Sequence, residues 1–225
     1  MKKYVVFLAV VPFLFFLISP AFAAISLYDW AFNIDGGISE NFGGDPFPSI
    51  GTLDSSGFGT LSWSTNVAGT HNFDAFFDFE IDEPANTFFN ESGVAVGTVA
   101  AEQSWEIDEP GYVFGDIYDN LLASTLDNSN GVPAGLEDDV SFALGWDFTL
   151  AAGETAFLNY VLSDIVPNTD FYLSHTDPDS QASLFFSSSL VIRDGNVPIP
   201  EPSTLLLFGS SLAGLGFYLR KRRAR

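Results

Sequence analysis

Hydrophobic and polar side chains alternate with a period of two through the middle of the chain. The clearest run covers residues 140–150, where one face carries Val140, Phe142, Leu144, Trp146, Phe148 and Leu150. Such alternation predicts a strand with one buried face. Residues 75–81 and 184–192 alternate in the same way. Weaker patterns predict further strands at residues 25–34, 59–63, 94–99, 104–107, 156–162 and 171–174.

Clusters of turn-forming residues separate these segments. They are Asp35-Gly36-Gly37 and residues 43–46, 82–84, 128–131 and 177–179, all rich in Asp, Asn, Gly or Pro. No amphipathic helical segment of convincing length lies between them. Many short strands with turns at near-regular spacing predict an all-β fold, an antiparallel β-sandwich in which the jelly roll is the favoured variant.

The first 23 residues have a different pattern. Lys2 and Lys3 precede an apolar run that ends before Ser19-Pro20, and Ala21 and Ala23 place small residues where a signal peptidase examines its substrate. This order predicts a secretory signal peptide, residues 1–23, that is cut before Ala24. The rest of the chain is therefore expected to be exported.

The C-terminal end has a third pattern. Residues 197–202 contain three prolines and predict an extended linker. Residues 203–219 carry no charge, and a helix of this length would rise roughly 25 Å, slightly short of a ~30 Å hydrocarbon core. The basic end, residues 220–225, includes the membrane-stop residues Arg220, Lys221, Arg222 and Arg223. We therefore predict a single transmembrane helix over 203–219 with the C-terminus in the cytoplasm.

The tail also resembles a known sorting signal. Pro200-Glu201-Pro202, followed by Ser203-Thr204, an apolar helix and an arginine-rich end, is similar to the PEP-CTERM motif found on exported proteins of Gram-negative bacteria that make extracellular polysaccharide. The resemblance implies that an exosortase recognises Pro200, Glu201 and Pro202. It also implies a transient inner-membrane precursor that is then delivered to the cell surface or extracellular matrix. Residues from about 83 to 192 look similar to cargo domains that precede such tails, a group with no established activity.

These patterns divide the chain into a signal peptide (1–23), an exported domain (24–196) and a sorting tail (197–225). The exported domain has one cation, Arg193, against 28 carboxylates, a net charge of −27. A nucleic-acid partner is excluded because phosphates are bound by Lys and Arg. The whole chain lacks cysteine, which excludes disulfides and thiolate metal sites. The many Phe and Trp residues of the domain argue against disorder.

Few residues carry chemistry. We place His71 in a strand region and His175 in a turn, and the chain has no G-x-S-x-G elbow for a serine nucleophile. Paired carboxylates could act in a glycosidase, but with this many acids close pairs are expected by chance. We therefore expect no catalytic residues and no enzyme.

Calcium is the only cofactor that the sequence suggests, since hard cations prefer clustered carboxylate and amide oxygens in turns. The candidate ligands are Asp127, Asn130 and Asp138, from the 127–131 turn and the 137–139 acidic run. The turn departs from the EF-hand pattern because its glycine is at the fifth position and not the sixth. The alternative is an acidic turn hydrated by water, with no cofactor.

Three functions remain open for the exported domain. The leading hypothesis is a structural or adhesive, non-enzymatic protein of the surface or the exopolysaccharide matrix. The first alternative is a carbohydrate-binding module or lectin that uses Phe76, Trp105 or Tyr112 for stacking. The second is a secreted glycan hydrolase. The expected partners are signal peptidase, exosortase, the membrane and, in the matrix, exopolysaccharide.

Overall fold

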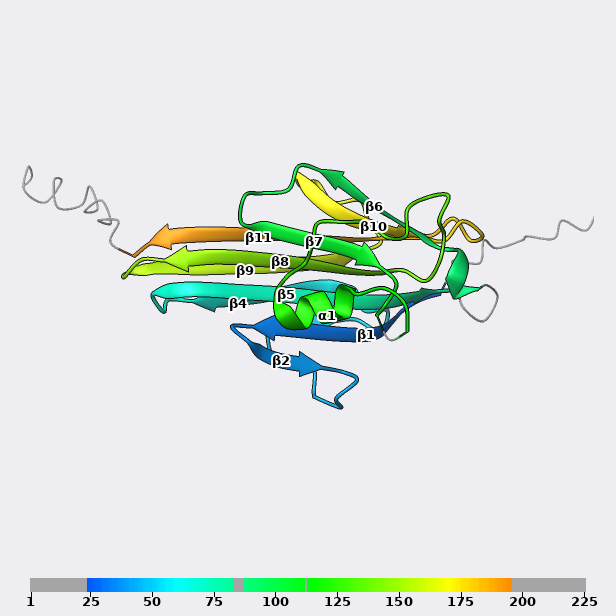
Figure 1. Cartoon of the computed structure of the whole chain (residues 1–225). Helices are drawn as coiled ribbons and strands as arrows, with labels where there is room; N and C mark the ends of the chain where they lie inside the picture. Colours follow the sequence, from blue (N-terminus) through cyan, green and yellow to red (C-terminus); the bar gives the residue numbers. More distant parts are fainter. Residues whose placement is uncertain (1–23, 83–86, 112, 196–225) are drawn as a thin grey trace, which may run out of the picture.

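The computed structural model describes residues 24–82, 87–111 and 113–195. They form two antiparallel sheets packed face to face (Figure 1). Sheet A has the order β2 (Gly37–Glu40), β1 (Ile25–Ile34), β5 (Gly69–Ile81), β8 (Ser141–Leu150) and β7 (Gln103–Asp108). Sheet B has the order β3 (Gly51–Leu53), β4 (Gly59–Thr65), β9 (Glu154–Ser163), β11 (Ser183–Asp194), β10 (Phe171–Thr176) and β6 (Ser92–Gly97). The predicted β-sandwich is confirmed.

All nine predicted strands are present, with ends shifted by a few residues. The pattern missed β2 and β3, which are too short to show a period of two and pair at sheet edges with β1 and β4. It also missed a 3-10 helix, η1 (Phe88–Asn90), and one α-helix, α1 (Ile117–Ala123). The described part of the chain contains no helix long and apolar enough to cross a membrane, and the predicted span 203–219 lies outside the described residues.

The predicted turn at residues 35–37 forms the β1–β2 hairpin. Asp35 and Gly36 both have positive φ, +52° and +80°. Two consecutive left-handed residues match the twist of a two-residue hairpin, and Asp-Gly is a favoured pair there because glycine has no Cβ to clash. This turn therefore follows directly from local sequence.

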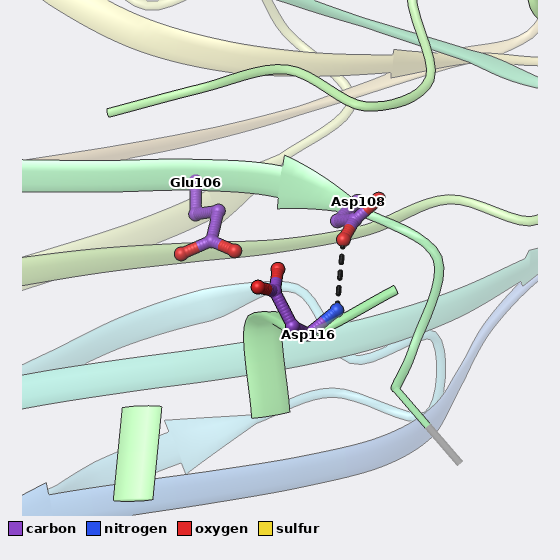
Figure 2. Close-up of side chains that lie close together, drawn as sticks. All are labelled: Glu106, Asp108 and Asp116. Atoms are coloured by element: carbon purple, nitrogen blue, oxygen red, sulfur yellow. Dashed lines mark hydrogen bonds between the residues drawn. The ribbon is translucent and has the colours of Figure 1, made fainter. Parts of the chain in front are cut away.

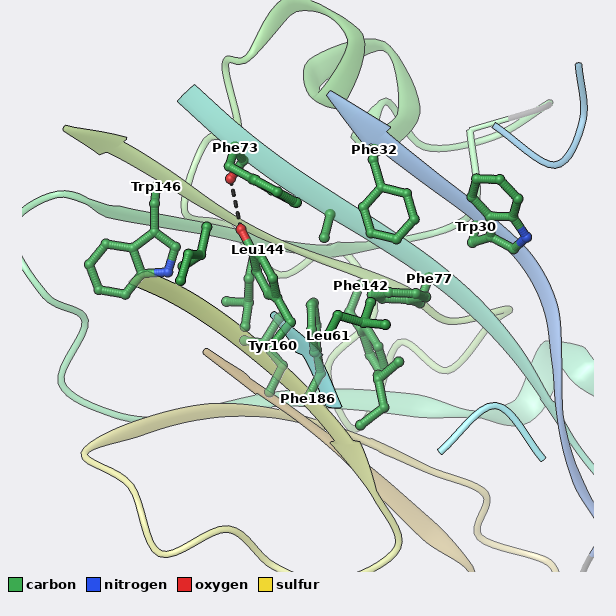
Figure 3. Close-up of a cluster of buried hydrophobic side chains, with 14 of the residues drawn as sticks. Trp30, Phe32, Leu61, Phe73, Phe77, Phe142, Leu144, Trp146, Tyr160 and Phe186 are labelled. Atoms are coloured by element: carbon green, nitrogen blue, oxygen red, sulfur yellow. Dashed lines mark hydrogen bonds between the residues drawn. The ribbon is translucent and has the colours of Figure 1, made fainter. Parts of the chain in front are cut away.

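The main core lies between the two sheets and is dominated by aromatic rings (Figure 3). Phe186 of sheet B contacts Phe77 and Phe142 of sheet A, with ring centroids 5.1 and 5.2 Å apart. Tyr160 is also buried, and its hydroxyl donates a 2.7 Å hydrogen bond to the carbonyl of Phe73, as Figure 3 shows. The inward-facing residues of the two sheets thus form a core of packed aromatic rings. The Tyr160 hydroxyl, although buried in this core, has a backbone carbonyl as its hydrogen-bond acceptor.

A second, smaller core covers the outer face of sheet A. Figure 1 shows α1 lying against this sheet, and Ile117 and Leu121 of the helix pack on Phe76 and Ala143. The alternation placed Phe76 on a polar face, but it is 0% exposed. That interpretation was wrong because a strand pattern identifies two faces and does not reveal that a distant helix covers the second one.

Among the described residues, no helix covers the outer face of sheet B. Its centre consists of three rows of paired residues from β4, β9 and β11, with polar hydroxyls, one amide and three apolar side chains. The rows are Thr60, Val161 and Ser187; Ser62, Asn159 and Ser189; and Ser64, Phe157 and Val191. We call these nine residues the carboxylate-free face. Ser187 is buried, and the other eight are partly or fully exposed. At the border of this face, the guanidinium of Arg193 lies 5.0 Å from the ring centre of Phe157.

Candidate functional site

Three carboxylates meet on the outer side of sheet A (Figure 2). Glu106 and Asp108 extend from the same side of β7, and Asp116 immediately precedes α1. One carboxylate oxygen of each lies within 4.8 Å of those of the other two. Asp108 accepts a 2.9 Å hydrogen bond from the backbone N–H of Asp116, which ties the start of the helix to the strand. The fold thus brings Asp116 next to two acids that precede it in the chain by 8 and 10 positions.

Burial controls the charge of this group. It raises the pKa of Glu106 to about 7, although hydrogen bonds from Asn120 and from the Asp127 N–H favour the charged form. Burial also raises the pKa of Asp108. The donor set is all oxygen, which suits a hard cation such as Ca²⁺, but three carboxylates supply fewer than its usual six to eight ligands. Both oxygens of Glu106 already accept from the side-chain amide of Asn120.

The calcium ligands expected from the sequence have other positions. Asp127 closes its own turn by accepting the Ser129 N–H, while its backbone N–H donates to Glu106. The side-chain amide of Asn130 donates a hydrogen bond to the Gly93 carbonyl, and its oxygen accepts one from the Val132 N–H. The carboxylate of Asp138 accepts a hydrogen bond from the backbone N–H of its neighbour Asp139. These contacts give each residue a role in holding loops. Calcium binding stays a prediction, and the sequence pattern did not point to Glu106, Asp108 or Asp116.

His175 forms a buried pair with Glu91 at one end of the sandwich. The sequence placed His175 in a turn, but it lies in β10, pairs with Gly93 of β6 and is 0% exposed. Its Nε2 shares a hydrogen bond with Glu91 Oε2. Burial raises the pKa of Glu91 to about 9 and lowers that of His175 to about 3, so both side chains favour their neutral forms. Among the described residues, Glu91 Oε1 and His175 Nδ1 have no hydrogen-bond partner.

A small pocket of about 300 Å³, which we call the end pocket, has three acidic residues in its lining. Its lining includes Glu109, Asp138 and Asp139 with the exposed rings of Phe88 and Phe114. Burial raises the pKa of Asp139 to about 6. The end pocket is therefore the place where the structure combines accessible carboxylates with exposed aromatic rings.

His71 has a structural set of contacts. It is in β5, and its Nδ1 lies 2.9 Å from Asp35 in the β1–β2 turn while its Nε2 lies 2.8 Å from the Val67 carbonyl. The hydrogen bond with Asp35 raises the pKa of His71. Both ring nitrogens are thus engaged in holding two turns next to β5.

A larger cleft of about 650 Å³, which we call the β7–β11 cleft, opens at another place in the sandwich. It is lined by the segment after β6, by Gln103 and Trp146 of sheet A, and by residues of β10, β11 and the loop before β10. The full set is Gly97, Thr98, Val99, Ala100, Gln103, Trp146, Thr169, Asp170, Phe171, Ser188, Ser189 and Leu190. Among these residues Asp170 is the only charged one, in a domain with 28 acids.

The stacking candidates from the sequence do not gather at one site. Phe76 is buried under α1, and Tyr112 lies outside the described residues. Trp105 is partly buried against the main core, with its ring centre 6.0 Å from that of Phe171. Sequence patterning did not suggest Trp146, because it sits on the face of β8 expected to be fully buried. Trp146 becomes part of the lining of the β7–β11 cleft together with residues of β10, β11 and the segment that follows β6.

Comparison with known proteins locates one family, in the tail. Residues 198–223 match the PEP-CTERM protein-sorting motif. The chain carries a PEP-CTERM sorting motif. No curated protein and no solved structure matches the chain.

The PEP-CTERM motif indicates an exported protein that is sorted by an exosortase, with a membrane-anchored precursor on the way to the cell surface. The match includes Pro200, Glu201 and Pro202, and it confirms the resemblance seen in the sequence. The predicted signal cleavage at Ala21–Ala23 and the basic membrane stop fall outside the described residues. The PEP-CTERM match covers the tail alone and describes no activity for residues 24–196.

Proposed function

We propose that the exported domain is a structural or adhesive, non-enzymatic module of the bacterial surface or the exopolysaccharide matrix. The carboxylate-free face is the observation that carries this proposal. A domain with net charge −27 repels other acidic surfaces, and the repulsion is weakest where an exposed face has no carboxylate. On this face, Phe157 and Val191 are 38% and 44% exposed and add apolar contact area among the hydroxyl groups.

Charge substitution tests the adhesive role. Ser64→Asp would place a carboxylate beside Phe157 on the carboxylate-free face, and Ser55→Asp would add the same charge in an exposed turn between β3 and β4. We expect Ser64→Asp to reduce retention of the protein on cells and matrix, measured by quantitative immunoblot of washed fractions. Equal retention of the two variants would contradict the adhesive role of the face.

The carboxylate positions support a non-enzymatic role. Glu91 and Glu106, whose pKa values burial raises most clearly above the acidic range, are each 0% exposed. The β7–β11 cleft has one carboxylate in its lining, whereas glycoside hydrolysis uses a pair across the scissile bond.

The hydrolase alternative has one specific observation in its favour, the end pocket. Asp139, with a pKa of about 6, has the property expected of a general acid, and Glu109 and Asp138 lie in the same lining. Release of reducing sugar from exopolysaccharide by the purified full chain, and its loss in Asp139→Asn, would establish this alternative. We expect no release.

The sorting proposal includes the finer points of topology. We propose that a signal peptidase cuts before Ala24, and that the precursor crosses the inner membrane of a Gram-negative cell once with its C-terminus in the cytoplasm. Replacing Pro200, Glu201 and Pro202 with alanine should leave export intact, since membrane insertion depends on hydrophobicity and terminal arginines. Full-length protein should then accumulate in the inner-membrane fraction, seen by fractionation and intact-mass analysis. Normal arrival at the surface would contradict recognition of the tripeptide.

The jelly-roll interpretation of the sandwich also remains a proposal. It is supported by the repeated crossing of the chain between the sheets, from β4 in sheet B to β5 in sheet A, then to β6 in sheet B and back to β7. Such alternation between sheets is what a jelly roll requires.

A further inference from the structure

The polar centre of the β7–β11 cleft is the hydroxyl of Ser188. Its oxygen accepts a 2.8 Å hydrogen bond from Trp146 Nε1 and a 3.0 Å hydrogen bond from Gln103 Nε2. A serine hydroxyl has two acceptor positions and one proton to donate. Because the two donors fill both acceptor positions, the Ser188 proton is left to donate, and none of the described residues accepts it.

The two donors are themselves fixed in place. Trp146 is 6% exposed and Gln103 is 8% exposed, so neither side chain is free to turn into solvent. The Gln103 Oε1 accepts a 3.3 Å hydrogen bond from the Ala100 N–H, which directs its amide nitrogen toward Ser188. The direction of the Ser188 hydroxyl is therefore set before any ligand arrives, and this reduces the entropy lost on binding.

The walls of the cleft combine apolar and uncharged polar groups. Val99 and Leu190 supply aliphatic surface, and Thr98, Thr169 and Ser189 supply further hydroxyl groups. A volume of about 650 Å³ is within the usual range of small-molecule sites, roughly 300–1,000 Å³. The lining thus offers a hydroxyl donor, other hydroxyls and apolar contact area, with little charge.

We propose that the β7–β11 cleft binds an uncharged sugar unit, with the Ser188 hydroxyl donating to a ligand oxygen. A pyranose ring presents hydroxyl oxygens at its edge and C–H groups on its faces, which match the two kinds of lining. An anionic ligand is opposed by the charge of −27, and a cation meets one carboxylate, Asp170. A purely apolar ligand would bury the Ser188 donor unpaired, which is costly. This inference deepens the proposed adhesive function by naming a ligand class and a site.

Binding of defined probes tests the proposal. The full chain is purified in a zwitterionic detergent, because a maltoside or glucoside headgroup would compete for the cleft. The uncharged probes are maltotriose, cellotriose, mannotriose and chitotriose, and the comparison probes are an oligoglucuronate and octanoate. Affinity is measured by titration calorimetry, and contacts are measured by saturation-transfer NMR. We expect at least one uncharged probe to bind more tightly than both comparison probes.

Variants then assign the binding to the cleft. Ser188→Ala removes the donor and should weaken binding at least about threefold, the scale of one neutral hydrogen bond. Val99→Trp adds a large ring to the exposed side of the lining and should weaken binding more than tenfold without altering the core. Ser64→Ala, on the outer side of β4, makes the same chemical change as Ser188→Ala away from the cleft and should bind as the wild type does. Melting temperatures verify that each variant is folded.

Three results would overturn the proposal: no uncharged probe binds, octanoate or oligoglucuronate binds more tightly, or Val99→Trp retains full affinity. A loss of fold in Ser188→Ala would leave Val99→Trp to decide. The result is separable from the adhesion test, because Ser64 belongs to the carboxylate-free face and not to the cleft lining. Absence of sugar binding together with loss of cell retention in Ser64→Asp would refute the cleft and keep the adhesive face. Loss of sugar binding in Val99→Trp with retained adhesion would keep the cleft as a sugar site and separate it from adhesion.

Discussion

The outer faces of the two sheets differ although both begin as the polar half of an alternating strand pattern. On sheet A, α1 and the loops around it bury Phe76 together with carboxylates such as Asp74 and Glu106. On sheet B, the carboxylate-free face stays open and carries mainly hydroxyl groups. The difference teaches that an outward strand position can be a core position, a buried charge or a contact surface, and that the covering element decides which.

The cover also changes the electrostatics of the acids beneath it. Burial raises the pKa of Asp74 to about 6, that of Glu106 to about 7 and that of Asp78 well above its ordinary value. Hydrogen bonds from Ser124 and Asn72 to Asp74 favour its charged form and offset part of the effect. The carboxylate-free face has no acid whose protonation could change the stability of sheet B in this way.

The largest expected effect comes from one pair of matched substitutions. Phe76→Ala should destabilise the protein by about 3–5 kcal/mol, because it opens a cavity beneath α1. Phe157→Ala makes the same change on the open face, where the ring is 38% exposed, and should cost about 1 kcal/mol or less. Urea unfolding followed by circular dichroism measures both. Similar losses in the two variants would show that α1 does not cover sheet A as described.

The next effect is a dependence on pH. The pKa values of Asp74 and Glu106 are raised in the folded state, so their contribution to stability is full below about pH 4 and is lost as pH rises through about 6 to 7. Glu91, with a pKa of about 9, acts in the same direction, while His175, with its lowered pKa, destabilises the fold below about pH 6.5. We therefore expect a higher melting temperature at pH 6 than at pH 8. Over this interval Glu106 changes the stability by about 1 kcal/mol and Glu91 by more, whereas Asp74, whose titration is half complete at pH 6, contributes less.

Substitution assigns this pH dependence to sheet A. Asp74→Asn should flatten the curve of melting temperature against pH between about pH 4 and pH 6, where Asp74 titrates. It should also raise stability at pH 8, since it removes a buried charge and keeps an acceptor for Ser124. Asp194→Asn, which changes an exposed carboxylate at the end of β11, is the control and should leave the curve unchanged. An Asp74→Asn curve as steep as that of the wild type would assign the titration to other groups.

The smallest effect concerns the border of the carboxylate-free face. Arg193→Ala removes the cation that lies over Phe157, and the expected cost is about 0.5–1 kcal/mol because the pair is exposed. The matched control is Arg193→Ala in the Phe157→Ala background, which has no ring left to contact. A double-mutant cycle on thermal unfolding measures the interaction, and a coupling energy near zero would exclude a cation–π contribution.

Local sequence was sufficient for several features. Residues 140–150 predicted β8 because alternation is a property of neighbouring residues, and Asp35-Gly36 predicted its hairpin turn because glycine and aspartate tolerate positive φ. The Pro-Glu-Pro tail was identified in the same way, from residues close together in the chain. Each of these features depends on contacts or spacing over a few residues.

The candidate sites depended on residues far apart. Glu91 and His175 are separated by 84 positions, and Ser188 meets Trp146 and Gln103 across separations of 42 and 85. The sequence pattern around each of these residues does not indicate which distant residue it contacts. The sequence by itself therefore determined nine of the eleven strands that the structure describes, several of their turns, the acidic charge and the sorting tail. Only the tertiary structure decided which polar residues are buried, paired or left with a free donor, because packing brings together side chains that the strand period cannot relate.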